Sequence, residues 1–216
     1  MISRIFLTIL LVASVIFIVQ EGPASVQQPP PVQQGASPQK PSSQQHAPGH
    51  RLADSLQTKL DHIQANGEQP HPDQAPTVMT EEEVNDYVAS GRIVLPQGVK
   101  KLKMEGRSGV VTAFLNVDFD EIRAGQNSFN PMLSVFSGQH DVRVEADASG
   151  SAREGRVHVR EVNIDGISVP HMALEYFVSK YITPKYPNVG IDSQFQLPNK
   201  IDVATVGYHK VTVTQK

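Results

Sequence analysis

The sequence predicts an α+β domain over residues 79–216, with an antiparallel curved sheet that has helices packed on one side. Three observations support this class. A helix-start signal at Thr80 is followed by short segments in which apolar and polar residues alternate, and a second helical segment interrupts them near Pro170. Strands and helices in this order are typical of an antiparallel sheet with helices packed against it.

The domain begins with a capping box. Glu83 follows Thr80 by three residues, so each side chain can accept a hydrogen bond from the backbone N–H of the other residue. Met79 and Val84 occupy the positions of a hydrophobic staple. We therefore expect a helix that ends near Gly91 and has a buried face made of Val84, Tyr87 and Val88.

The next segments predict an antiparallel pair of strands over residues 99–104 and 111–119, joined by a turn at 106–109. The apolar positions of the second strand are Val111, Ala113, Leu115, Val117 and Phe119. Residues 120–124 should form a helical turn. Asn130 as cap and Pro131 at the first helical position predict another short helix over residues 131–136.

The clearest strand follows. One face of this strand carries Val142, Val144, Ala146 and Ala148, and the other carries Asp141, Arg143, Glu145 and Asp147. After the loop at 150–155, the returning strand places Arg156, His158 and Arg160 on its polar face, where they can pair with the acidic side chains. The alternation shifts near Glu161, which predicts a β-bulge, and Asp165-Gly166 predicts a tight turn.

A second helix is expected to begin after Val169-Pro170 and to end before Pro184. The rest of the chain predicts strands over residues 191–197, 201–206 and 211–214, with turns at Pro198-Asn199 and near Gly207.

The first twenty residues form an apolar segment in which Arg4 is the only charged side chain. The segment lies between a signal-peptide core of about 7 to 15 residues and a membrane span of about 20. We favour an uncleaved membrane anchor, because Gly22-Pro23-Ala24 is a poor match to a cleavage site; the alternative is secretion after cleavage there. Under either alternative the positive-inside rule places the following residues outside the cytoplasm.

Three further segments precede the domain. Residues 21–50 are rich in Gln, Pro and Ser and are expected to form a disordered, extended linker. Residues 51–67 predict an isolated amphipathic helix, and residues 68–78 return to a Pro-rich linker composition. The apolar stripe of this helix either packs on the domain or frays, or it binds a protein partner or a second copy through Leu52, Leu56, Leu60 and Ile63.

Composition limits the chemistry. The chain has no cysteine, so a disulfide framework and a thiolate metal or redox site are excluded. Its net charge is −3 and it lacks a basic stripe, so nucleic acid is not an expected partner. We find no catalytic or phosphate-binding motif and expect neither an enzyme nor a cofactor. His140, Asp141 and His158 fall short of the ligand set of a closed metal site.

The later helical segments carry more apolar side chains than one modest sheet requires. These candidate lipid-binding residues are Phe129, Met132, Leu133, Phe136, Leu174, Phe177, Val178 and Tyr181. One explanation is an ordinary core. The other is a groove for an acyl chain, lined by flexible Met and aromatic side chains.

Four blocks of the domain resemble the LmeA-like phospholipid-binding family of bacterial cell-envelope proteins. They are TEEEVNDYV, LPQGVKKLKMEGRSGVVTAFLNVDFDEI, GRVHVREVNIDGISVPHMALEYFVSKY and LPNKIDVATVGYHKVTVTQ. The resemblance implies a membrane-tethered or secreted α+β domain that binds lipid and has no catalytic residues. Together with the N-terminal segment, it predicts a periplasmic domain held at the bacterial inner membrane with its N-terminus in the cytoplasm. The long Gln/Pro linker departs from compact members of the family. The alternative is an envelope protein–protein interaction module without a small ligand.

Overall fold

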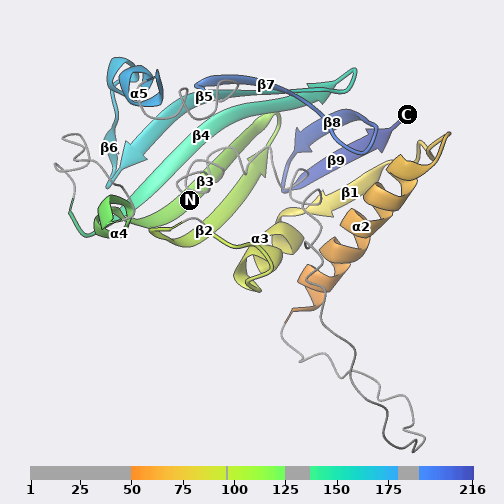
Figure 1. Cartoon of the computed structure of the whole chain (residues 1–216), viewed down its shortest axis with the longest axis horizontal. Helices are drawn as coiled ribbons and strands as arrows, with labels where there is room; N and C mark the ends of the chain where they lie inside the picture. The colour runs from red at the N-terminus through yellow and green to blue at the C-terminus, as the bar shows by residue number, and fades with distance from the viewer. Residues whose placement is uncertain (1–49, 96, 125–136, 180–189) are drawn as a thin grey trace, which may run out of the picture.

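The computed structural model describes residues 50–95, 97–124, 137–179 and 190–216 (Figure 1). In this part of the chain, a nine-stranded antiparallel open sheet is accompanied by a few helices, which confirms the α+β class. The expected anchor and nearly all of the expected linker lie outside the described residues, as does the helix expected at 131–136. No described helix is both long and apolar enough to cross a membrane.

Four long strands form the first half of the sheet as successive antiparallel neighbours. They are β2 (Val99–Arg107), β3 (Val110–Asp118), β4 (Gln139–Ser151) and β5 (Glu154–Ile164). Both predicted strand pairs are confirmed. The bulge is confirmed as well, because Glu145 pairs with Glu161 but Ala146 pairs with Val159, which leaves Arg160 as the extra residue.

The turn between β4 and β5 is tighter than the sequence suggested. Ala152 and Arg153 have φ angles of 51° and 65°, so the hairpin closes through two residues rather than through the whole segment 150–155. Two-residue turns with positive φ match the twist of the flanking strands. The strands therefore extend beyond the alternating segment from which they were predicted.

The second half of the sheet brings distant parts of the chain together. β8 (Ile201–Gly207), β9 (Lys210–Gln215) and β1 (Thr77–Thr80) are consecutive neighbours, and β8 joins the first half through Ser149 and Gly150 of β4. On the other side, β6 (Ile167–Ser168) and β7 (Asp192–Gln196) both pair with β5. Strand β1 was not expected. It begins within the Pro-rich segment and buries Met79.

The capping box predicted at Thr80 is confirmed at the start of α3 (Glu81–Ala89). The Glu83 backbone N–H donates to Thr80 Oγ1 at 3.2 Å, and the Thr80 backbone N–H donates to Glu83 Oε2 at 2.8 Å. Helix α3 lies beside strand β2, because the Asn85 side chain hydrogen-bonds to both the N–H and the C=O of Met104, at 2.8 Å each. An edge of the sheet that would otherwise be open is thus occupied by a side chain.

Helix α2 (Arg51–Glu68) does not stand apart from the domain. Leu56, Leu60 and Ile63 are buried in a cluster with apolar residues of β1, β8 and β9, whereas Leu52 is exposed. The buried amides of Asn66 and Gln215 are joined by a hydrogen bond of 2.8 Å, which fixes the helix on β9. The structure therefore shows the first of the two alternatives for this stripe, packing on the domain, for three of its four residues.

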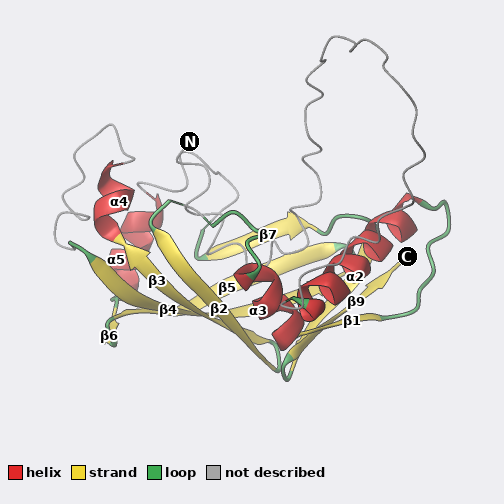
Figure 2. Ribbon diagram, turned by 90° about the horizontal axis from the view of Figure 1, so that it is seen from below, coloured by secondary structure: helices red, strands yellow, loops and turns green. Residues whose placement is uncertain are grey.

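The helices stand at the two ends of the sheet (Figure 2). α2 and α3 accompany the half that contains β1 and β9, while α4 (Phe119–Ala124) and α5 (His171–Phe177) lie at the opposite end. α4 confirms the helical turn expected over residues 120–124, and α5 confirms the second helix up to Phe177.

Candidate functional site

The pleat of β2 to β5 gives the sheet an apolar face and a polar face. One row across the apolar face is Leu102, Leu115, Val142 and Ile164, and the next is Met104, Ala113, Val144 and Val162. Between these rows, on the polar face, lie Lys103, Phe114, Arg143 and Asn163. The apolar face supplies most of the main core. Side chains of the polar face line two hollows, and the larger hollow is also bordered by apolar residues of the main core.

The sequence-predicted lipid-binding residues do not form a single described site. Leu174 and Val178 of the α5 region pack against the main core and are partly buried. The side chain of Phe177 falls outside the described structure. The same is true of Phe129, Met132, Leu133, Phe136 and Tyr181.

A groove of about 910 Å³ extends from the β2 edge of the sheet across β3 and β4 to Asn163 of β5. We call it the edge groove. Its lining includes Val88, Ile93 and Leu95 from the end of α3 and the segment that follows, and Lys103, Phe114 and Arg143 from the polar face. The hydrogen bonds of Asn85 hold α3 against β2 and so bring these two sets of residues close together. The volume lies in the range of small-molecule binding sites.

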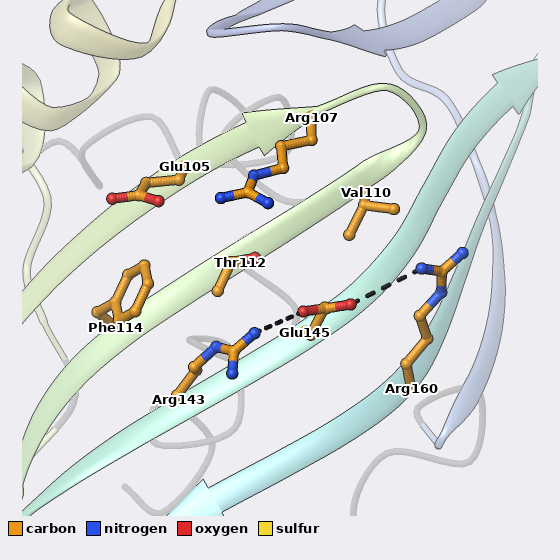
Figure 3. A pocket seen from close by; sticks show the side chains of 8 residues that line it. All are labelled: Glu105, Arg107, Val110, Thr112, Phe114, Arg143, Glu145 and Arg160. Carbon is orange, nitrogen blue, oxygen red and sulfur yellow. Dashed lines mark hydrogen bonds and ion pairs between the residues drawn. The ribbon is translucent and has the colours of Figure 1, made fainter. Parts of the chain in front are cut away.

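A second hollow, of about 490 Å³, is lined by the side chains drawn in Figure 3. It shares Phe114 and Arg143 with the edge groove. We call it the arginine pocket. Arg143 donates to Glu145 at 2.7 Å, and Glu145 also lies 3.7 Å from Arg160. Arg160 in turn forms two short contacts with Asp147, at 2.6 and 2.7 Å. The predicted pairing between the charged rows of β4 and β5 is therefore confirmed for Arg160, whereas His158 pairs with Asp192 of β7 instead.

The lining of the two hollows is cationic although the chain as a whole carries a net charge of −3. The cations are Lys100, Lys101, Lys103, Arg107, Arg143 and Arg160, and the carboxylates are Glu105, Asp141 and Glu145. Within the described residues, Lys101 and Arg107 form no ion pair with a carboxylate. Lys101 is available to an anionic ligand, whereas the charge of Arg107 also contributes to lowering the pKa of the nearby Glu105.

Ion pairing shifts the pKa values of Lys103, Glu105 and Arg160. The hydrogen bond from Lys103 to Glu105, 2.9 Å long, raises the pKa of Lys103 and lowers the pKa of Glu105. Hydrogen bonding to Asp147 likewise raises the pKa of Arg160. The cationic character of the polar face therefore does not depend on a group that titrates near neutral pH.

Phe114 is the residue of this site that the sequence could have revealed. It stands between the apolar positions Ala113 and Leu115, so the alternation assigns it to the wet face, where an aromatic side chain is unusual. No sequence pattern indicated that the residues on the α3 side would line the groove, because their role depends on where the helix lies relative to the sheet.

The histidines do not gather into a metal site in the part of the chain that the structure describes. His140 and His158 pair separately with Asp165 and Asp192, each at 2.5 Å.

No family model, curated protein or solved structure matches the chain. The side chains of the two hollows can bind an anion beside an apolar group.

Proposed function

We propose that this domain binds a lipid with an anionic headgroup, and that it does so outside the cytoplasm while tethered to the bacterial inner membrane by its N-terminal segment. The observation that carries the proposal is the edge groove, which combines an apolar wall with a cationic one. An amphiphile presents the same two surfaces to its binding site.

The apolar part of the ligand would lie against Phe114. This side chain is 37% exposed on an otherwise polar face, and Leu95 is partly exposed on the α3 side of the groove. Covering such surface with an acyl chain is favourable by about 25 cal/mol per Å² of apolar area removed from water. A purely polar ligand would leave the aromatic ring without this gain.

The anionic part would be held either by Lys101 in the edge groove or by Arg107 in the arginine pocket, because the two residues are about 20 Å apart along β2. Arginine binds phosphate oxygens through two parallel N–H donors, and lysine acts as a point charge. Because neither residue is paired with a carboxylate within the described structure, binding an anion would break no existing ion pair of theirs.

Two sequence features support the proposed location. The apolar segment at residues 1–20 is suited to a membrane anchor, and the domain resembles a family of lipid-binding envelope proteins. Neither feature suggests catalysis. We accordingly propose lipid binding or lipid handling without an enzymatic step.

The test is a titration of the full chain with a fluorescent acyl-chain phosphatidylglycerol, together with mass spectrometry of lipids that co-purify with it. Phe114→Ser and Lys101→Gln should each weaken probe binding about tenfold, equivalent to 1.4 kcal/mol. Val203→Ser is the matched control for the first variant, because Val203 is also an apolar strand residue that is 37% exposed but lies outside the groove. Lys210→Gln is the control for the charge.

Both control variants should bind the probe as the wild type does. If wild type takes up no probe, or if Val203→Ser weakens binding as much as Phe114→Ser, the groove is not a lipid site. The envelope interaction module would then be the better explanation of the polar face.

A further inference from the structure

Strand β7 is an outer strand of the sheet, because β5 is its only strand neighbour within the described residues (Figure 1). At one end of β7 the carbonyl of Ile191 accepts a hydrogen bond of 2.8 Å from β5, and at the other end the Leu197 N–H donates one of 2.8 Å to β5. The odd-numbered residues of β7 therefore turn their backbone groups to β5. The residues whose N–H and C=O groups face outward are Asp192, Gln194 and Gln196.

These three outward-facing residues, which we call the β7 edge, have unused backbone groups. In the parts of the chain that the structure describes, none of their N–H or C=O groups takes part in a hydrogen bond. Their side chains are exposed. Strand edges usually carry a lysine, a proline or a bulge that prevents pairing with another strand. The sequence DSQFQ contains neither of those residues, and its register with β5 has no shift.

The opposite edge of the sheet, at β2, is closed by groups of the protein itself. The Asn85 side chain occupies both the N–H and the C=O of Met104. Glu81 accepts a hydrogen bond of 3.0 Å from the Gly106 N–H, and the His209 N–H donates to the carbonyl of Gly106 at 3.0 Å. The contrast between the two edges indicates that the β7 edge is suited to a strand from outside the chain.

We propose that the β7 edge pairs with the β7 edge of a second copy of this chain, as antiparallel strands related by a two-fold axis beside Gln194. In this register Gln194 lies opposite the same residue of the second copy, and Asp192 lies opposite Gln196. Each opposed pair exchanges two backbone hydrogen bonds, so every outward N–H and C=O of the β7 edge gains a partner.

The side chains of β7 are complementary to themselves in this register. Asp192 is the only charged residue of the strand and lies opposite a neutral amide, so no like charges are opposed. The Gln194 amide contains both a donor and an acceptor and can therefore hydrogen-bond to its own counterpart. On the other face, half-buried Phe195 lies opposite Ser193, and pairing covers part of the apolar area that remains exposed.

The symmetry of this pairing suits two chains anchored in one membrane. The two-fold axis runs perpendicular to the sheet, so both polar faces lie on the same side and both N-terminal linkers leave at the same height. A strand of five residues buries less than the roughly 800 Å² per partner of a stable interface. Confinement to one membrane raises the effective concentration and favours such a weak contact. Only this last step rests on the proposed tether, since the pairing itself does not require lipid binding.

The test uses the absence of cysteine from the chain. The full-length Gln194→Cys variant is reconstituted in phosphatidylcholine vesicles and exposed to a mild oxidant. Opposed residues in a hydrogen-bonded pair have Cα atoms about 5.5 Å apart, within the range that a disulfide spans. The matched control is Gln196→Cys, on the same strand and face, whose counterpart in the second copy lies about 15 Å away. Gln194→Cys should give at least tenfold more disulfide-linked dimer than Gln196→Cys.

A mixture of two variants tests the register. Asp192→Cys and Gln196→Cys should each stay monomeric alone but form a mixed disulfide when reconstituted together, because these positions are opposed. Adding Gln194→Lys to both chains should abolish the mixed disulfide, since two lysines would then face each other. Adding Gln194→Lys to one chain and Gln194→Glu to the other should retain it.

The proposal is overturned if Gln194→Cys stays monomeric, if Gln196→Cys alone forms as much dimer, or if the mixed disulfide does not respond to the charges at position 194. A monomeric result would leave the edge to an extended peptide of another protein. Gln194→Lys should bind the acyl-chain probe as wild type does, because Gln194 does not line the edge groove. Failure of the pairing and failure of lipid binding are therefore distinguishable.

Discussion

Replacing Glu83 by alanine should be the most informative single test of how the N-terminal helix is attached. Glu83 is buried and belongs to the capping box of α3, yet it also accepts hydrogen bonds from α2. Lys59 Nζ donates to both carboxylate oxygens at 2.7 Å, and Ser55 Oγ donates at 2.5 Å. One carboxylate therefore stabilises a helix start and a helix–helix contact together.

The magnitude follows from these two roles. Loss of a capping interaction costs about 1 kcal/mol. Loss of the charge-assisted hydrogen bonds from Lys59 adds about 1.5 to 3 kcal/mol. Because the Lys59 side chain is partly exposed, it can turn to solvent and does not become a buried unpaired charge. We expect Glu83→Ala to lower the free energy of unfolding by about 2.5 to 4 kcal/mol.

The assay is urea unfolding of Glu83→Ala beside Glu82→Ala, which removes an exposed carboxylate from the neighbouring position. The control should lie within about 0.5 kcal/mol of wild type. If the two variants lose the same stability, the contacts of Glu83 with α2 contribute nothing measurable and the argument is refuted.

The same carboxylate should give a pH dependence. Burial raises the pKa of Glu83, but hydrogen bonds from Lys59, Ser55 and the backbone of Thr80 outweigh it and hold the pKa below its ordinary value of 4.5. A depressed pKa means that the stabilisation is present above the ordinary pKa and is lost as the pH falls through the folded-state value. The stability difference between wild type and Glu83→Gln should therefore shrink from about pH 6 to about pH 3.

Two further predictions concern other contacts. The hydrogen bond with Asp165 raises the pKa of His140, so this pair should stabilise the fold fully below pH 6.5 and less as the pH rises through the folded-state pKa; an unchanged His140 NMR titration in Asp165→Asn would contradict it. A Cβ on Gly67 would lie 2.5 Å from the carbonyl oxygen of Asn199. Gly67→Ala should thus cost about 1 to 3 kcal/mol in thermal or urea unfolding, and equal stability of Gly67→Ala and the exposed-site control Glu68→Ala would show that the backbone yields there.

The elements that depend on local sequence were predicted well. Thr80 and Glu83 are three residues apart, so their capping box requires no knowledge of the rest of the fold. The two long hairpins were predictable for the same reason, because alternation assigns each residue to a face of its strand. The bulge near Glu161 followed from a break in that alternation.

Contacts between distant segments were not predictable in this way. The sequence showed an apolar stripe on residues 51–67. It did not show that Met79, Ile201 and Val213, which are distant in sequence, cover this stripe. Strand β1 was not predicted because its four residues pair only with β9, which lies more than a hundred residues later in the sequence. A short strand has little local signal and depends on its partner.

The candidate site likewise has some features that local sequence determines and others that only tertiary contacts determine. The sequence by itself determined that Phe114 faces the polar side and that Lys101, Lys103 and Arg143 share that side, because the pleat of a strand has a period of two residues. Only the tertiary structure decided that these side chains border a groove. That outcome depends on Asn85, whose amide hydrogen-bonds to the backbone of Met104 and holds α3 beside β2. Periodicity records the direction of a side chain within its own element, whereas a groove requires the position of one element relative to another.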